Sequence, residues 1–145
     1  MVKVLIKKLD PAVKIPNYET KGASGMDLMA FIQKTIKLAP QSSCLVPTGL
    51  SVAFSDEYEI QIRPRSGLAA KKNISILNTP GTIDSDYRGE IKIILFNHGN
   101  SEFIINNKDR IAQMVLMPVK KMELEVAENL PDTLRGKGGF GSTGK

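Results

Sequence analysis

Three adjacent polar groups of different kinds stand out in the segment RPRSGLA, residues 63–69. Arg65 offers a guanidinium, Ser66 a hydroxyl and Gly67 an unobstructed backbone N–H, directly after a predicted strand. Such groups in succession can hold phosphate oxygens. The plainer interpretation is an ordinary turn beside a solvated arginine, and this segment alone does not distinguish the two.

Two carboxylates lie two residues apart in the segment NTPGTIDSDYRGEIKI, residues 78–93. In an extended chain Asp84 and Asp86 face the same side. They could bind a metal ion or divide the roles of general base and orienting group, or they could cap the turn. We predict that two strands flank this turn as a hairpin, whose backbone could read the edge of a small base. Tyr87 either stacks on a sugar or covers the hairpin.

Arg110 and Gln113 are unusual in the otherwise apolar strand predicted around KDRIAQM, residues 108–114. Polar groups inside a strand need hydrogen-bond partners when they are buried. Phosphate or water would provide them, and so would core hydrogen bonds at a contact between subunits.

Residue counts exclude several kinds of catalytic centre. His98 is the only histidine, which excludes a histidine-based metal cluster, and no G-x-S-x-G nucleophile motif occurs. We predict that Cys44, within an apolar segment, belongs to the core and is not a nucleophile. The remaining carboxylates, arginines, hydroxyls and glycines favour attack by an activated water on a phosphate chain.

The C-terminal segment GGFGSTGK, residues 138–145, partly resembles a phosphate-binding loop, since residues 139–145 read G-x-x-x-x-G-K. A P-loop is followed by a helix, and here the sequence has none. After Met122 the chain has few large apolar residues, so the plain interpretation is a disordered tail. The alternative is a lid over a phosphorylated aromatic ligand, because cationic, hydroxyl and aromatic side chains alternate with the glycines.

The overall composition fits one domain of 145 residues with 41% apolar content and a single cysteine. That cysteine excludes an intramolecular disulfide, and no apolar run approaches the length of a membrane span. We therefore expect a cytoplasmic protein that does not contact membranes. The net charge of +5 favours an anionic partner, although a solvated basic surface would give the same value. Only 6% of residues are aromatic, which disfavours a stacking platform for nucleic acid.

Short alternating segments separated by turn residues predict an all-β fold. In YEIQIR, Ile60 and Ile62 face one way and the polar residues between them the other. Only LAAKKN, residues 68–73, predicts a helical turn. The expected fold class is a β-sandwich, β-barrel or jelly roll. Further strands are predicted at residues 2–9, 35–40, 44–54, 74–78, 90–97, 102–106 and 110–122.

Five segments in order resemble the motifs of the trimeric dUTPase family, and together they span nearly the whole chain. They are ASGMDLMA (residues 23–30), RPRSGLA (63–69), NTPGTIDSDYRG (78–89), DRIAQM (109–114) and RGKGGFGSTG (135–144). The resemblance implies a jelly-roll-like β-barrel and a homotrimer with sites shared between subunits. It also implies hydrolysis of dUTP to dUMP and diphosphate, which limits uracil in DNA and supplies dUMP for thymidylate synthesis. Residues 1–122 would form the catalytic body, and residues 123–145 an arm and lid that reaches a neighbouring subunit.

The resemblance further implies a role for each motif residue. Asp84 would be the general base that activates water for attack on the α-phosphorus, with Gln113 placing that water. Mg²⁺ would be bound through the triphosphate and water with no direct protein ligand, and Asp27 would support its hydration shell. The residues implied for uracil and deoxyribose are Asn78, Gly81, Thr82, Ile83, Tyr87, Lys92 and Phe140. Those implied for the phosphates are Arg65, Ser66, Gly67, Arg110, Arg135, Gly141, Ser142 and Thr143.

Three other functions stay open on the sequence. A dCTP deaminase would share the fold and some motifs and would release ammonia. A dUTPase-like sensor would bind the nucleotide and a protein partner without hydrolysis. A β-barrel that binds nucleic acid would follow from charge alone, but we expect no stable nucleic-acid binding because the aromatic platform is missing.

Overall fold

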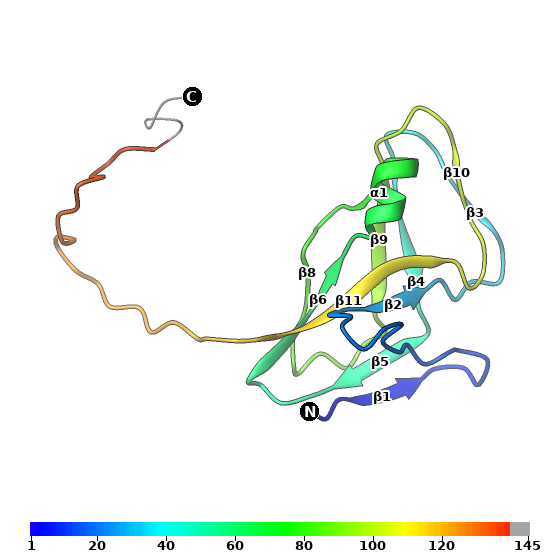
Figure 1. Cartoon of the computed structure of the whole chain (residues 1–145), viewed down its shortest axis with the longest axis horizontal. Coiled ribbons are helices and arrows are strands. Elements are labelled where there is room, and N and C mark those ends of the chain that lie inside the picture. The colour runs from blue at the N-terminus through cyan, green and yellow to red at the C-terminus, as the bar shows by residue number, and fades with distance from the viewer. Residues whose placement is uncertain (140–145) are drawn as a thin grey trace.

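The computed structural model describes residues 1–139, and within them the chain is nearly all strand (Figure 1). One short helix interrupts the strands. In chain order the elements are β1 (Leu5–Lys8), β2 (Met26–Met29), β3 (Ile36–Leu38), β4 (Ser43–Pro47), β5 (Leu50–Ala53), β6 (Tyr58–Arg63), α1 (Ser66–Lys72), β7 (Ile74–Ile76), β8 (Gly81–Ile83), β9 (Lys92–Asn97), β10 (Phe103–Ile105) and β11 (Arg110–Pro118).

The strands pair antiparallel in four small sheets. The largest has the order β2–β11–β6–β8 and the next β4–β9–β7, while β1 pairs with β5 and β10 with β3. Within residues 1–139 these pairings do not close into a ring. The predicted all-β, jelly-roll-like fold is therefore confirmed, but the sheets form an open arrangement and not a closed barrel.

A single apolar core lies between the sheets, with buried residues from every one of them. Strand β6 shows how the sequence pattern leads to it. Ile60 and Ile62 are only 3% exposed, whereas the polar residues between and beside them are half-buried on the other face. The alternation predicted for this segment is confirmed, and it fixes which face of the largest sheet carries polar side chains.

The hairpin predicted across residues 78–93 is wrong. Strand β8 pairs with β6, whereas β9 pairs with β4 on one edge and β7 on the other. A strand has two hydrogen-bonding edges, so β9 has none left for β8. The two strands separate after the turn and belong to different sheets.

Two other elements differ from the sequence prediction. The single strand predicted at residues 44–54 divides into β4 and β5 at Gly49, whose φ of +69° suits a residue without a side chain. Helix α1 spans Ser66–Lys72, longer than the predicted turn, and ends at Asn73 in the left-handed conformation. Strand β2 was not predicted, because Leu28 is its only fully buried residue and no alternation marks it.

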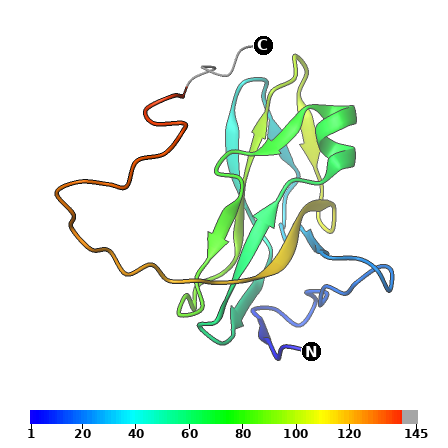
Figure 2. The same cartoon turned by 60° about the vertical axis from the view of Figure 1, so that its left-hand side comes forward.

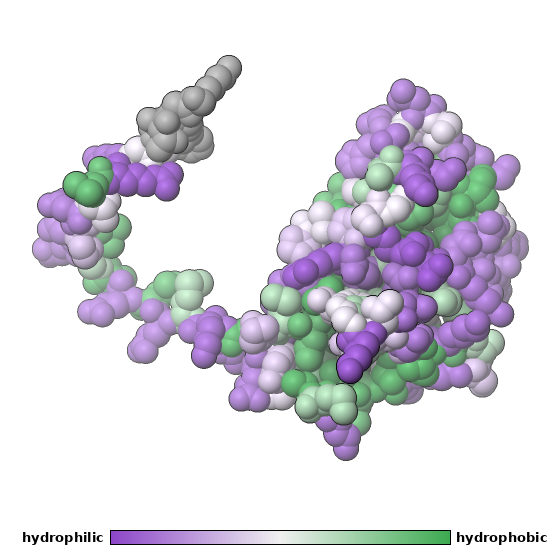
Figure 3. Space-filling model, viewed as in Figure 1, coloured by the Kyte–Doolittle hydropathy of each residue, from purple (hydrophilic) through white to green (hydrophobic). Residues whose placement is uncertain are grey.

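The segment after β11 leaves the body as an extended arm (Figures 1 and 2). From residue 119 to residue 139 it contains no helix or strand, and its large apolar side chains are mostly exposed. Figure 3 shows apolar surface on the lower part of the body, near the point where the arm leaves it. In residues 1–139 no helix is long and apolar enough to cross a membrane.

Candidate functional site

Strand β11 brings three of the sequence motifs together because it pairs on both of its edges. Gln113 lies opposite Asp27 of β2 and opposite Arg63 of β6. Arg65 follows two residues after Arg63, and Arg110 lies at the start of β11. Residues far apart in the sequence thus meet at one end of the largest sheet.

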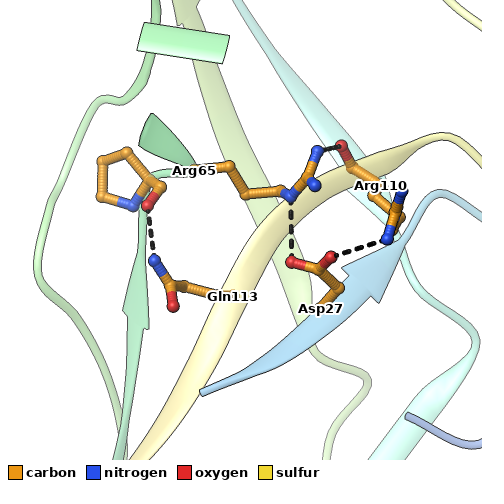
Figure 4. Close-up of polar contacts among 5 residues, drawn as sticks. Asp27, Arg65, Arg110 and Gln113 are labelled. Atoms are coloured by element: carbon orange, nitrogen blue, oxygen red, sulfur yellow. Dashed lines mark hydrogen bonds and ion pairs between the residues drawn. The ribbon is translucent and has the colours of Figure 1, made fainter. Parts of the chain in front are cut away.

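Asp27, Arg65 and Arg110 form a polar cluster at this end, which we call the arginine–aspartate cluster (Figure 4). Arg65 Nε donates to Asp27 Oδ1 at 2.9 Å, and Arg110 Nη1 lies 3.3 Å from Oδ2. Arg65 Nη1 also donates to the Arg110 carbonyl at 3.2 Å. One carboxylate therefore orients two guanidinium groups from different segments.

This cluster carries a net positive charge, because two guanidinium groups share one carboxylate. Its side chains remain partly open to solvent, with exposed fractions of 27% for Arg65, 47% for Arg110 and 19% for Asp27. Ser66 and Gly67 begin α1 beside it, are exposed, and no acidic residue lies in the first turn. The arrangement is suited to an anion with several oxygens, such as a phosphate chain.

The Gln113 side chain holds the backbone of the residue that precedes Arg65 in the sequence. Its Nε2 donates to the Pro64 carbonyl at 3.0 Å (Figure 4). Its Oε1 lies so close to Gly25 that a Cβ there would be only 2.6 Å away. The partners that the sequence required for Gln113 and Arg110 are thus present within one chain, and Gly25 leaves room for the glutamine amide.

A cleft lies where β8 and β9 separate, with a volume of about 370 Å³. Five of the predicted site residues line it. Its lining residues are Leu45, Thr82, Ile83, Asp84, Tyr87, Glu90, Lys92 and Ile94. Asn78 and Gly81 do not line this cleft, although the Asn78 amide lies 3.4 Å from where a Cβ on Gly81 would stand.

Asp84 lies at the rim of this cleft, directly after β8, and is exposed. It also borders a second, acidic cleft together with Asp56, Glu59 and Asp86. The Asp84 carbonyl accepts the Tyr87 N–H at 3.1 Å, which closes the turn. Asp84 therefore presents its carboxylate to solvent at the edge of a pocket, where a water molecule could be activated.

Tyr87 forms one wall of the cleft and is held at its tip. Its hydroxyl donates to the Glu90 carbonyl at 3.0 Å, and its ring covers Gly89 so closely that no Cβ would fit there. The Glu90 carboxylate in turn accepts the Gly49 N–H at 2.8 Å and lies 3.7 Å from Lys92 Nζ. Sequence reasoning missed Glu90, and only its position beside the turn could have indicated it.

The cleft and the arginine–aspartate cluster lie far apart within one chain. Asp27 is on β2 and Asp84 follows β8, the two opposite edges of the largest sheet. The strand register also places Asp84 about four residues along β6 from Arg63. Three strand spacings and four residue rises combine to roughly 20 Å between the two regions.

The predicted residues of the C-terminal segment are only partly described. Arg135 is exposed, and its Nε donates to the Gly138 carbonyl at 2.9 Å within a local turn. It belongs to the arm that extends away from the body (Figure 1). Predictions for Phe140, Gly141, Ser142 and Thr143 lie outside the described residues.

Cys44 is half-buried in β4 and packs against the core. Burial raises the pKa of its thiol. A raised pKa disfavours the thiolate, the reactive form of cysteine. This agrees with the expectation that Cys44 is not a nucleophile.

Sequence comparisons identify similar proteins over nearly the full length. A family model described as dUTPase matches residues 12–144. The chain is 54% identical to the deoxyuridine 5'-triphosphate nucleotidohydrolase of Nautilia profundicola, over 99% of this chain and 100% of the relative. It is also 54% identical to the protein of the same name from Chlamydia pneumoniae, over 94% and 95% of the two chains.

Solved structures with the same fold include phage dUTPases. The dUTPase of Staphylococcus bacteriophage 80alpha with dUPNHPP has a TM-score of 0.88 at 24% identity, covering 99% of both chains. A mutant dUTPase from phage phi11 of S. aureus, described with a structural Mg(II) ion, has a TM-score of 0.80 at 22% identity and covers 90% of this chain and 99% of that one. At these identities the likeness establishes the fold.

Proposed function

Because the chain belongs to the dUTPase family, we propose that it hydrolyses dUTP to dUMP and diphosphate. The observation that carries the proposal is the 54% identity, over the full length, with a relative that bears the name of this activity. The reaction removes dUTP from the DNA precursors and supplies dUMP for thymidylate synthesis. We further propose a cytoplasmic location.

The cleft between β8 and β9 is the proposed site for the nucleoside. Backbone groups of residues 81–83 and of Lys92 would read the uracil edge, with Asn78 beside them. Tyr87 would pack under the deoxyribose and leave no room for a 2′-hydroxyl. In support, Thr82, Ile83 and Lys92 line the cleft and the Tyr87 ring is held in place by a hydrogen bond. A site that leaves its polar groups unpaired with the wrong base can discriminate by about 10⁴–10⁵.

Asp84 is the proposed general base. It would take a proton from a water molecule as the oxygen of that water bonds to the α-phosphorus. The bond between the α-phosphorus and the oxygen that bridges to the β-phosphorus would break, and diphosphate would leave with that oxygen and its electron pair. Its exposed position at the rim of the cleft supports this role. Gln113 would act on the water indirectly, since its amide already donates to Pro64 in the same chain.

The arginine–aspartate cluster is the proposed phosphate-binding region, and it would act on a nucleotide held by a neighbouring subunit. The separation of roughly 20 Å from Asp84, obtained from strand spacing and residue rise, supports this because one phosphate chain cannot bridge both regions. We therefore propose a homotrimer whose sites combine residues of different subunits. Ser66 and Gly67 would add a hydroxyl and backbone N–H groups to the two guanidinium groups.

Mg²⁺ is the proposed metal ion, held by the triphosphate and water. Residues 1–139 contain no group of three His, Cys, Asp or Glu side chains close enough to hold a metal ion. Both oxygens of Asp27 already contact arginines, so Asp27 would reach such an ion only through water. When bound, the ion would neutralise charge on the phosphates.

The arm is the proposed second functional unit, with the body at residues 1–122 and the arm at residues 123–145. Arg135, Gly141, Ser142 and Thr143 would contact the γ-phosphate, and Phe140 would stack on the uracil. The exposed apolar side chains of residues 122–134 support a segment that binds another subunit. Closing such a glycine-rich arm costs conformational entropy, which contacts with the triphosphate would offset.

The test is to incubate the purified protein with each deoxynucleoside triphosphate and Mg²⁺ and to measure diphosphate and ammonia. Diphosphate from dUTP alone is expected. Ammonia from dCTP would instead identify a deaminase, and binding of dUTP without turnover would identify a sensor. Asp84→Asn should bind dUTP but lose at least about 10²-fold in kcat, because a positioned base contributes that much or more. Near-normal turnover would contradict the role of Asp84.

A further inference from the structure

Glu90 occupies a position between the wall of the cleft and the turn that joins β4 to β5. Its backbone carbonyl accepts the Tyr87 hydroxyl at 3.0 Å, while its carboxylate accepts the Gly49 N–H at 2.8 Å. The side chain is 21% exposed and lines the cleft. One residue thus links Tyr87 to a turn in another sheet.

The link is rigid at both ends. Gly49 has a φ of +69° and packs against Val13 and Phe31, so its N–H points in a fixed direction. At the other end, the Tyr87 ring lies against Gly89, where a side chain would not fit. The Glu90 carbonyl shares a planar peptide unit with the Ile91 N–H, which donates to the Leu50 carbonyl at 2.8 Å. The Glu90 carboxylate adds a second bond to the same turn, so the two bonds together hold the carbonyl that accepts the Tyr87 hydroxyl.

We infer that Glu90 is a positioning residue that sets the sugar selectivity of the site by holding Tyr87 against the 2′ position of the bound nucleotide. The inference rests on the proposed function, in which Tyr87 packs under the deoxyribose. To exclude a 2′-hydroxyl by steric contact, the Tyr87 ring must not be able to move away from the sugar. Without the carboxylate, the Glu90 carbonyl keeps the support of the Ile91 N–H bond but loses the second bond to Gly49, so the Tyr87 ring is held less tightly.

The fold does not depend on the Glu90 carboxylate alone. Thr48 Oγ1 donates to the Ile91 carbonyl at 2.7 Å, and the Ile91 N–H donates to the Leu50 carbonyl at 2.8 Å. These bonds hold the same turn to the start of β9 and are unaffected by a change at residue 90. Glu90→Ala should therefore fold, with its effect confined to the cleft.

The experiment compares kcat/KM for dUTP and UTP in the wild type, Glu90→Ala and Glu90→Gln. Glu90→Ala should reduce the dUTP-to-UTP ratio by about two- to tenfold, mainly through faster UTP turnover, since one of the two bonds that hold the Glu90 backbone is lost. Glu90→Gln keeps an acceptor for the Gly49 N–H and should restore most of the ratio. It loses only the partly exposed pair with Lys92, which contributes little. A merely structural role would reduce both activities together and leave the ratio unchanged.

Glu102→Ala provides the matched control, because Glu102 is an exposed glutamate away from the cleft. Its ratio should equal that of the wild type. An unchanged ratio in Glu90→Ala, or a fall in Glu90→Gln as large as in Glu90→Ala, would overturn the inference. Dissociation constants for dUDP and UDP, measured by calorimetry, report the selectivity between deoxyribose and ribose in binding alone, without hydrolysis. Selective binding with no hydrolysis would overturn only the proposed function, whereas equal binding of both by the wild type would overturn the role of Glu90.

Discussion

Removal of the Asp27 carboxylate is the sharpest test of how the arginine–aspartate cluster is held. Asp27 accepts a hydrogen bond from Arg65 at 2.9 Å and lies 3.3 Å from Arg110. Its side chain is only 19% exposed. Asp27→Ala would leave two neighbouring guanidinium groups without their shared counter-charge, so we expect a loss of folding stability.

The size of this loss follows from the exposure of each partner. The bond with Arg65 involves charged groups and contributes about 1.5–3 kcal/mol. Arg110 is 47% exposed, so solvent screens its contact and it adds at most about 1 kcal/mol. The free energy of unfolding should fall by about 1.5–4 kcal/mol. At about 2–4 °C for each kcal/mol, the Tm should fall by about 3–16 °C.

The assay is thermal unfolding followed by circular dichroism at one protein concentration, because assembly would make Tm depend on concentration. Asp56→Ala is the matched control. Asp56 lies 3.6 Å from Lys121, but their side chains are 75% and 76% exposed. Such a pair contributes between zero and about 1 kcal/mol. Equal Tm values for Asp27→Ala and the wild type, or an equal loss in Asp56→Ala, would refute the reasoning.

Inorganic phosphate adds a second comparison on the same two variants. If the two guanidinium groups bind anions, Asp27→Ala should gain more Tm from phosphate than the wild type does, since it has lost the competing carboxylate. Asp56→Ala should respond as the wild type does. A smaller gain in Asp27→Ala would show that the carboxylate is needed to shape the site.

Three further predictions concern the packing around these regions. Gly25→Ala should lower the free energy of unfolding by about 1–3 kcal/mol in chemical denaturation, because its Cβ would lie 2.6 Å from the Gln113 amide oxygen; a wild-type midpoint would contradict the close approach. Asn97→Ala should cost about 3 kcal/mol in the same assay, since this 1% exposed side chain bonds two carbonyls and the Gly99 N–H; a loss below about 1 kcal/mol would contradict it. Burial raises the pKa of Cys44, so its stabilising contribution is complete below the unfolded pKa of 9.0 and is lost as pH rises above it. Cys44→Ser should remove the part of the stability loss at alkaline pH that comes from this thiol. A free energy of unfolding with the same pH dependence as the wild type would argue against the raised pKa.

Local patterns in the sequence predicted the strands that are buried on one face. The alternation around Ile60 and Ile62 was sufficient to place β6 and to orient it. The same approach failed for β8 and β9, where two strands beside one turn suggested a hairpin. Their partners are chosen by strands distant in the sequence, and β9 is paired on both edges. A local pattern carries no information about such choices.

The candidate site likewise has features that the sequence predicts and features that only the tertiary structure reveals. The sequence by itself determined the kinds of groups available, their order along the chain and the family they belong to. Only the tertiary structure decided that Asp27 orients both Arg65 and Arg110, that Gln113 supports the backbone before α1, and that Glu90 connects the cleft to Gly49. These contacts depend on strand register, where a shift by one residue turns every side chain to the other face. Register is set by the packing of the whole core, which no single segment specifies.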